Sequence, residues 1–228
     1  MKKTLKIILV VFVVLSFAVG GLAIWQWKNI EGIIIGVSED SAEIERRRSD
    51  NQTQLVQDVS AYMDEPLREM TQEEKELLEK GKISAAEIYQ QIFEEKKTEI
   101  QDSKPKKTAD NSAKKDEIVS RYMAELYKLQ SEFVARAEAT IVQGANYYES
   151  INEHPQDPVA RAKTITHFTP IVKGIESECN AKVDSLIENM KNELQAIEAD
   201  ISIIDSIRKT YENEKQLKLS YYANKYLK

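Results

Sequence analysis

The stretch that decides the fold reads DEIVSRYMAELYKLQSEFVARAEATIVQGANYYESI and covers residues 116–151. Apolar or small side chains recur in it at the spacing of one helix face, in nine steps from Ile118 to Ile151, which are 33 positions apart. A period this close to that of the α-helix keeps the stripe nearly parallel to the helix axis. The stripe consists of Ile118, Tyr122, Leu126, Leu129, Phe133, Ala137, Ile141, Gly144, Tyr148 and Ile151. We therefore predict one long amphipathic helix here.

A turn and a second striped helix follow this helix. Asp157 can cap the second helix, and Pro158 suits its first position. Its apolar stripe covers residues 175–211, and Pro170 ahead of the stripe predicts a kink or a restart. Two striped helices joined by a short turn form an antiparallel hairpin. We therefore assign residues 116–228 to a long, coiled-coil-like helical hairpin.

The sequence of residues 38–102 predicts shorter helices. Two capping boxes mark helix starts, one formed by Thr71 and Glu74 and the other by Ser84 and Glu87. The second helix of the hairpin overshoots the first, and its overhang offers an apolar surface for these shorter helices. The predicted fold is therefore all-α, with the hairpin braced by shorter helices into a three- or four-helix bundle.

Two segments differ in composition from the helices around them. Residues 28–37 contain IEGIIIGV, which is too short to span a membrane, and we predict an apolar juxtamembrane segment. Residues 103–115 are polar and rich in lysine, with Pro105 and no large apolar side chain. Such a composition predicts a solvated linker.

A hydrophobic run lies near the N-terminus. After the short basic tail of residues 1–6, the eighteen residues from Ile7 to Ile24 carry no charge. A helix over residues 7–27 would be about 31 Å long, which matches the ~30 Å hydrocarbon core of a bilayer. The residues suited to the membrane–water interface are Trp25, Trp27 and Lys28. We predict that this segment is a single transmembrane anchor in contact with membrane lipid.

The charges around the anchor predict its direction. Three lysines precede it, and one, Lys28, follows it at once. The positive-inside rule therefore favours a single-pass protein of the plasma (cytoplasmic) membrane, with the N-terminus inside and residues 28–228 outside. The basic triplet at residues 46–48 argues for the opposite direction.

The alternative to an anchor is a cleaved signal peptide, which would make this a secreted helical protein. A small-residue cleavage site is available at residues 18–20. The apolar run is longer than the ~7–15 residues usual for such a peptide, and bulky residues follow the possible site. The sequence therefore favours the uncleaved anchor.

Charge and cysteine content exclude some classes of protein. The formal net charge is −6, and residues 1–37 carry four lysines against one glutamate, so the remainder holds 28 basic and 37 acidic residues, a net of −9. A surface that acidic repels nucleic-acid phosphates, so we predict no nucleic-acid partner. The one cysteine, Cys179, excludes an intrachain disulfide.

Few residues suggest chemistry. The two histidines, His154 and His167, have no metal-ligand spacing with cysteines or carboxylates. The chain also lacks a nucleophile elbow and a glycine-rich phosphate loop. We therefore predict no catalytic, cofactor-binding or metal residues, no cofactor and no enzymatic activity. No motif identifies a family.

Aromatic residues offer candidate interaction sites. They gather near the predicted hairpin turn and at the C-terminus, as Tyr147, Tyr148, Tyr221, Tyr222 and Tyr226. Tyrosines are enriched at protein interfaces, although packing within the bundle also explains them. We predict a membrane-anchored, noncatalytic helical scaffold or protein-interaction domain that binds a protein partner or itself. The alternative is a ligand-sensing or ligand-binding ectodomain that signals through a partner.

Overall fold

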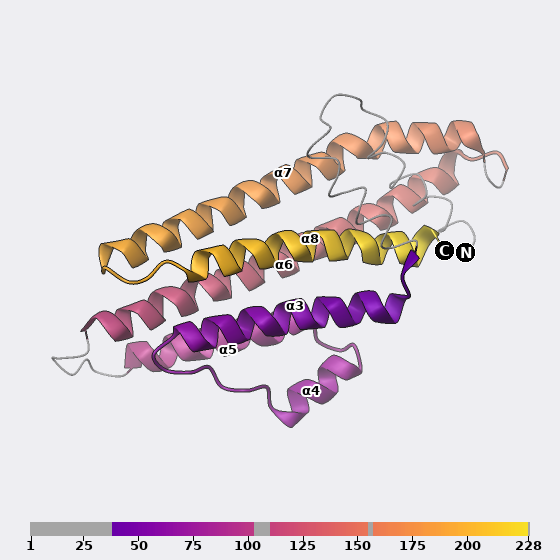
Figure 1. Ribbon diagram of the computed structural model, residues 1–228. Coiled ribbons are helices and arrows are strands. Elements are labelled where there is room, and N and C mark those ends of the chain that lie inside the picture. Colours follow the sequence, from indigo (N-terminus) through magenta and orange to yellow (C-terminus); the bar gives the residue numbers. More distant parts are fainter. Residues whose placement is uncertain (1–37, 103–109, 155–156, 228) are drawn as a thin grey trace. The chain divides into compact units, whose positions relative to one another are not determined.

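The computed structural model describes residues 38–102, 110–154 and 157–227, which form six α-helices and contain no strand. The helices are α3 (Ser41–Tyr62), α4 (Gln72–Glu79), α5 (Ala85–Asp102), α6 (Asp110–Ile151), α7 (Pro158–Ala196) and α8 (Ile203–Leu227), as Figure 1 shows. The predicted all-α class and the helical bundle are confirmed. None of these helices is long and apolar enough to cross a membrane. The predicted anchor, with Trp25, Trp27 and Lys28, and residues 28–37 lie outside the described residues.

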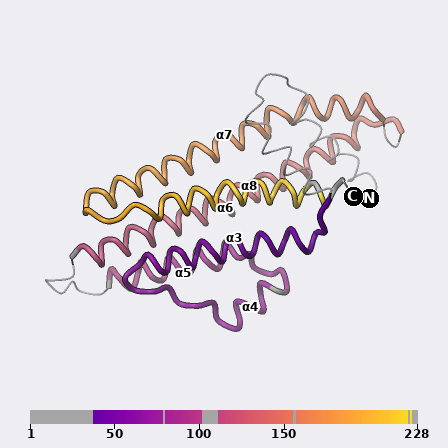
Figure 2. The backbone as a smooth tube through the Cα atoms, viewed as in Figure 1, coloured from indigo at the N-terminus to yellow at the C-terminus, as the bar shows by residue number. Residues whose placement is uncertain are grey.

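The chain forms two compact units. Unit 1 contains the chain up to Asn51, Ala135–Glu178 and the chain from Tyr211 onward, whereas unit 2 contains Gln52–Val134 and Cys179–Thr210. Helices α3, α6, α7 and α8 contribute residues to both units, and α4 and α5 belong to unit 2 alone. Figure 2 traces the path of the chain through these helices. Unit 1 is therefore built from parts of four helices.

In unit 2, the core includes the contact of α5 with α6 and buried side chains of α7. The ring of Tyr127 on α6 lies 5.5 Å from that of Tyr89 and 5.9 Å from that of Phe93, both on α5. The fully buried side chains of this unit include Ile88, Ile92, Phe93, Met123, Ile187, Met190 and Leu194. Burial of each such side chain contributes about 1.5–3 kcal/mol to the free energy of unfolding.

In unit 1, α6 and α7 pack as antiparallel partners next to the turn that joins them. Tyr148 is fully buried there between Ala145 and Ala160. Asp157 accepts hydrogen bonds at Oδ1 from the backbone N–H groups of Val159 (2.9 Å) and Ala160 (3.2 Å). The predicted cap at Asp157, with Pro158 as the first residue of α7, is therefore confirmed.

Both predicted capping boxes are present in unit 2. Thr71 Oγ1 accepts from the backbone N–H of Glu74 (3.2 Å), and the Glu74 carboxylate accepts from the N–H of Thr71 (2.7 Å). The same reciprocal pair forms between Ser84 and Glu87, at 3.2 and 2.8 Å. Each box satisfies two backbone donors that the first helical turn would leave without partners.

The second predicted helix does not continue to Tyr211, so a hairpin of only two helices over residues 116–228 is wrong. Helix α7 ends at Ala196, and α8 begins at Ile203. Glu198 has a φ of 57°, in the left-handed region, and Ala199 N–H donates to the carbonyl of Leu194 at 3.0 Å. This is a Schellman ending, which glycine most often supplies.

Two further predictions differ from the structure. The composition predicts a polar linker over residues 103–115, but α6 already begins at Asp110. Lys115 forms an ion pair with Asp64 at 3.0 Å, so tertiary polar contacts hold this first part of α6 in the absence of large apolar side chains. Of the two alternatives predicted at Pro170, a kink or a restart, the restart is wrong, because α7 runs through this residue. Residues 103–109 lie outside the described part of the chain.

Candidate functional site

An open groove lies on the outer face of α7 near the α6–α7 turn, within unit 1. It has a volume of about 910 Å³, and its lining includes Tyr147 of α6 with Val159, Lys163, His167, Pro170 and Ile171 of α7. The lining residues of α7 are spaced three and four apart, because they share one face of the helix. The groove is therefore a surface of one helix with an aromatic wall from its partner.

The hairpin carries large apolar side chains that point into solvent. Val159 is 60% exposed, Val142 is 56% exposed and Ile171 is 39% exposed. Of these three, Val159 and Ile171 line the groove. Exposed apolar groups gathered near a groove mark interaction surfaces more often than isolated ones do. Within the described residues, this part of unit 1 is therefore a candidate interaction site.

The two tyrosines predicted near the turn lie in different environments. Tyr147 is half-buried, and its ring stacks on His167 with centroids 5.0 Å apart and lies edge-on to Phe168 at 5.8 Å. Tyr148 is fully buried in the core of unit 1. Of this pair, only Tyr147 borders the groove.

The two tyrosines near the end of α8 lie beside an ionic cluster of unit 1. Arg48 on α3 donates to Glu214 on α8 from Nη2 at 2.9 Å and from Nε at 3.1 Å. Lys218 Nζ lies 5.5 Å from the ring centroid of Tyr221 and 5.6 Å from that of Tyr222. These half-buried rings therefore cover the cations of the cluster. The side chain of Tyr226 lies outside the described part of the chain.

Burial controls the electrostatics of this cluster. It raises the pKa of Glu214, an effect that the nearby Arg48 opposes. Burial lowers the pKa of Lys218, and the charge of Arg48 lowers it further. Because water is excluded from both partners, the pair of Arg48 and Glu214 is sensitive to loss of either side chain. The cluster therefore ties α3 to α8 in unit 1.

Asp116 joins the end of α3 to the start of α6 in unit 2. Its carboxylate is almost fully buried and accepts from the backbone N–H groups of Asp64 (3.0 Å) and Glu65 (2.9 Å). Burial raises the pKa of Asp116, whereas these two hydrogen bonds lower it. Asp116 thus caps the backbone where the chain leaves α3.

Tyr62 connects the same region of unit 2 to the turn between α7 and α8. Its hydroxyl donates to the backbone carbonyl of Asp200. Burial, followed by the charge of Asp200, raises the pKa of Tyr62 to about 12. The hydroxyl therefore stays protonated at neutral pH and donates a hydrogen bond as a structural contact.

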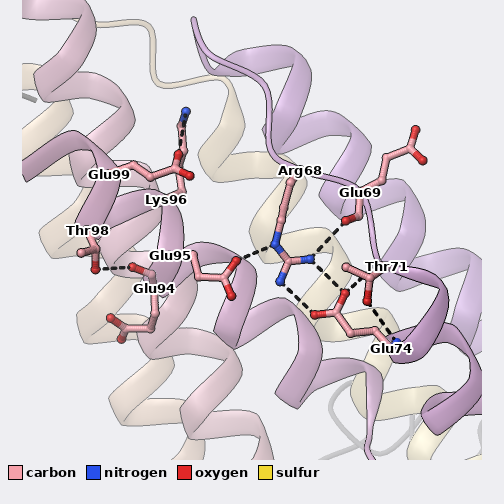
Figure 3. A network of polar contacts seen from close by, with 9 residues as sticks. All are labelled: Arg68, Glu69, Thr71, Glu74, Glu94, Glu95, Lys96, Thr98 and Glu99. Carbon is pink, nitrogen blue, oxygen red and sulfur yellow. Dashed lines mark hydrogen bonds and ion pairs between the residues drawn. The ribbon is translucent and has the colours of Figure 1, made fainter. Parts of the chain in front are cut away.

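Figure 3 shows another network of polar contacts in unit 2, in which Arg68 bridges α4 and α5. Its Nη2 lies 2.9 Å from Glu74 Oε1, and its Nε donates to Glu95. Arg68 and the backbone N–H of Thr71 lower the pKa of Glu74 to about 2. The carboxylate of one capping box therefore also fixes α4 to its neighbour.

The described side chains can be compared with the arrangement that a metal site requires. Residues 38–102, 110–154 and 157–227 contain no group of three His, Cys, Asp or Glu side chains placed to hold a metal ion. His167 lies in the groove with its ring stacked on Tyr147. The polar groups described above cap helices or join neighbouring helices. What the arrangement offers chemically is an apolar surface with nearby cations.

Sequence reasoning missed part of this site. The sequence identifies Tyr147 as a candidate but not Val159 and Ile171, because an apolar stripe reports only the helix face that is turned to the core. The available signal for Val159 is an apolar residue outside the stripe and next to a turn. The ionic partners Arg48 and Glu214 were also missed, since they are 166 residues apart in the sequence.

No protein-family model, curated protein or solved structure matches the chain.

Proposed function

We propose that this protein is a membrane-anchored, noncatalytic helical scaffold whose bundle, on the extracytoplasmic side, binds a protein partner or a second copy of itself. The observation that carries the proposal is the order of the segments along the chain. An uncharged run of eighteen residues, preceded by three lysines, comes just before a bundle that exposes large apolar side chains on its α6–α7 hairpin. An anchor followed by an exposed apolar surface suits a protein that acts by contact.

Ion pairs between helices of the bundle support the same proposal. Arg136 Nη2 donates to Glu178 at 2.8 Å in unit 1, and Arg121 donates to Glu193 in unit 2. These pairs join α6 to α7 within each unit. Charged residues used in this way specify how helices pack, which is what a scaffold requires.

The anchor and its direction are tested with the full chain in cells. A Cys179→Ser chain that carries Ser185→Cys offers one exposed thiol on α7. We expect the protein to stay with membranes during alkaline carbonate extraction, and a membrane-impermeant maleimide to label the thiol in intact cells. Labelling only after permeabilisation would reverse the direction, and release of a shortened chain into the medium would support the cleaved signal peptide instead.

The interaction role is tested by photo-crosslinking in the same cells. A benzophenone amino acid at Val142, which is 56% exposed on α6, is compared with the same group at Ser185. We expect a protein adduct or a dimer from position 142 and little from position 185. A strict monomer without any protein adduct would contradict the scaffold proposal.

A further inference from the structure

The turn of the hairpin and the part of α7 that follows it carry equal and opposite charge. Residues 139–157 contain three acidic side chains and no lysine or arginine, whereas residues 158–175 contain three basic side chains and no Asp or Glu. The acidic residues are Glu149, Glu153 and Asp157, and the basic residues are Arg161, Lys163 and Lys173. The whole chain has a formal net charge of −6, so two copies repel each other less at this neutral end than at their acidic surfaces.

The outer face of α7 at this end carries two large apolar side chains and two small residues. Val159 is 60% exposed and Ile171 is 39% exposed, and both line the groove. Ala162 and Gly174 are exposed as well, and a Cβ at Gly174 would meet no atom within 4 Å. Because the side chains at a contact set the distance between helix axes, a neighbouring helix can approach closely at the two small residues.

The order of these side chains is complementary to its own reversal. Val159 lies three positions before Ala162, and Ile171 lies three positions before Gly174. Reversal about the middle of the groove, between residues 166 and 167, exchanges position 159 with 174 and position 162 with 171. In an antiparallel copy of α7, Val159 therefore meets Gly174. Ile171 likewise meets Ala162, so each large side chain packs on a small one. A parallel copy would place every side chain opposite itself.

The same reversal brings opposite charges together. The exposed Lys173 lies on the same side of α7 as Thr166, because residues seven positions apart share one helix face. In an antiparallel copy, Lys173 comes next to the start of α7 and the exposed Glu153 of the turn. Lys163 then faces Pro170 instead of another lysine. A parallel copy would align like charges, which disfavours association.

We propose that the groove on α7 is the surface through which two copies of this protein form an antiparallel dimer with twofold symmetry. A closed twofold contact requires one surface that is complementary to itself, and this face meets that condition in both size and charge. The inference rests on the proposed function, because it takes a second copy as the partner of the scaffold. Opposite charges favour the antiparallel direction, and packing of large side chains on small ones sets the register.

Spin labels on the full chain in detergent micelles measure the direction of the contact. Thr166→Cys and Ser177→Cys, each in the Cys179→Ser chain, place labels on one exposed side of α7, about three turns apart. In the antiparallel dimer, the two labels at position 166 are on the order of 10 Å apart, whereas those at position 177 are about 30 Å apart along the helix axis. Two short distances would mean a parallel contact and would overturn the inference.

A pair of variants with the same change of charge identifies the face. Thr166→Glu places two carboxylates at the twofold axis, and we expect the dissociation constant of the dimer to rise at least about tenfold. Ser185→Glu, at an exposed position of α7 outside the groove, should change this constant less than about twofold. Sedimentation equilibrium of the full chain in micelles measures the constant, and circular dichroism checks that both variants remain helical.

An exchange of charges tests the register. Lys173→Glu places a carboxylate next to Glu153 of the second copy, and we expect the dissociation constant to rise about three- to tenfold. Adding Glu153→Lys restores a pair of opposite charges and should return the constant to within about twofold of its original value. A double variant that is no tighter than Lys173→Glu would overturn the proposed pairing.

Failure of the inference and failure of the proposed function give different results. If the chain stays monomeric while the benzophenone group at Val142 forms an adduct with another protein, the dimer is overturned and the scaffold proposal stands. A dimer that Thr166→Glu does not weaken forms through another surface and also overturns the inference. A monomer without any protein adduct contradicts both proposals.

Discussion

At the scale of single residues, two glycines in similar open surroundings predict opposite effects of the same substitution. Gly81 has a φ of 63° at the end of α4, whereas Gly174 lies inside α7, and a Cβ at either position meets no atom within 4 Å. We expect Gly81→Ala to lower the free energy of unfolding by about 1 kcal/mol, since alanine is strained at positive φ. Gly174→Ala should raise it by about 0.5–1 kcal/mol, because alanine favours the helix.

Urea denaturation of the two variants measures both effects. If both substitutions change the free energy of unfolding in the same direction, something other than backbone conformation determines their effect. Since neither methyl group meets a neighbour, packing contributes little to the comparison.

The ionic cluster of unit 1 predicts a larger effect at the same scale. Arg48→Met leaves the buried Glu214 without the guanidinium that donates to it, with Lys218 as the remaining nearby cation, and we expect a loss of about 2–4 kcal/mol in the free energy of unfolding. Arg46→Met is the control on the same helix, because Arg46 is 61% exposed and its ion pairs contribute at most about 1 kcal/mol. Adding Glu214→Leu to Arg48→Met should restore at least half of the loss. If the double variant is no more stable than Arg48→Met, the cost does not come from the stranded carboxylate.

At the scale of helices, the capping box of α4 predicts a dependence on pH. The pKa of Glu74 is lowered to about 2 from an ordinary value of 4.5, mainly by Arg68. The stabilisation from Glu74 is therefore complete above pH 4.5 and is lost as the pH falls toward 2. We expect the backbone amides of α4 to lose hydrogen-exchange protection in that range. Arg68→Gln should move the loss to higher pH, and an unchanged titration of Glu74 would contradict this assignment.

Helix ends also show where prediction from sequence succeeds and where it fails. The end of α4 carries a signal in the sequence, because Gly81 supplies the left-handed residue of a Schellman motif, with Lys82 N–H donating to Leu77 at 2.9 Å. The end of α7 has the same two hydrogen bonds around Glu198, a residue that gives no such signal. Capping boxes are local, so Thr71 and Ser84 were recognised. Contacts such as that of Lys115 with Asp64 are nonlocal, and periodicity does not report them.

The sequence also predicts some residues of the candidate site and not others. The stripe of α6 correctly assigns Tyr148 to the core, and the position of Tyr147 near the turn identifies it as a candidate. Whether an apolar residue outside the stripe is exposed depends on which other helices pack nearby, which the sequence pattern does not contain. Val159 is exposed for that reason, and only the three-dimensional arrangement of unit 1 identifies it.

At the scale of the whole molecule, we predict that the two units unfold together, because they share four helices. Helices α3, α6, α7 and α8 each contribute residues to both units, so unfolding of one unit removes the helical continuation that the other requires. Arg48→Met, in unit 1, should therefore weaken unit 2 as well. A loss of about 2 kcal/mol corresponds to roughly 30-fold faster exchange of amides that open only by global unfolding.

Hydrogen exchange of the full chain in a membrane mimetic measures this coupling. The informative amides are those of Met190 and Leu194 in unit 2 and of Tyr148 and Thr164 in unit 1, all buried. We expect Arg48→Met to accelerate all four to a similar extent and Arg46→Met to accelerate none more than a few-fold. Acceleration confined to Tyr148 and Thr164 would mean that unit 1 opens by itself. The helices would then break near the boundary between the units, and a partner that binds the hairpin would act on unit 1 without affecting unit 2.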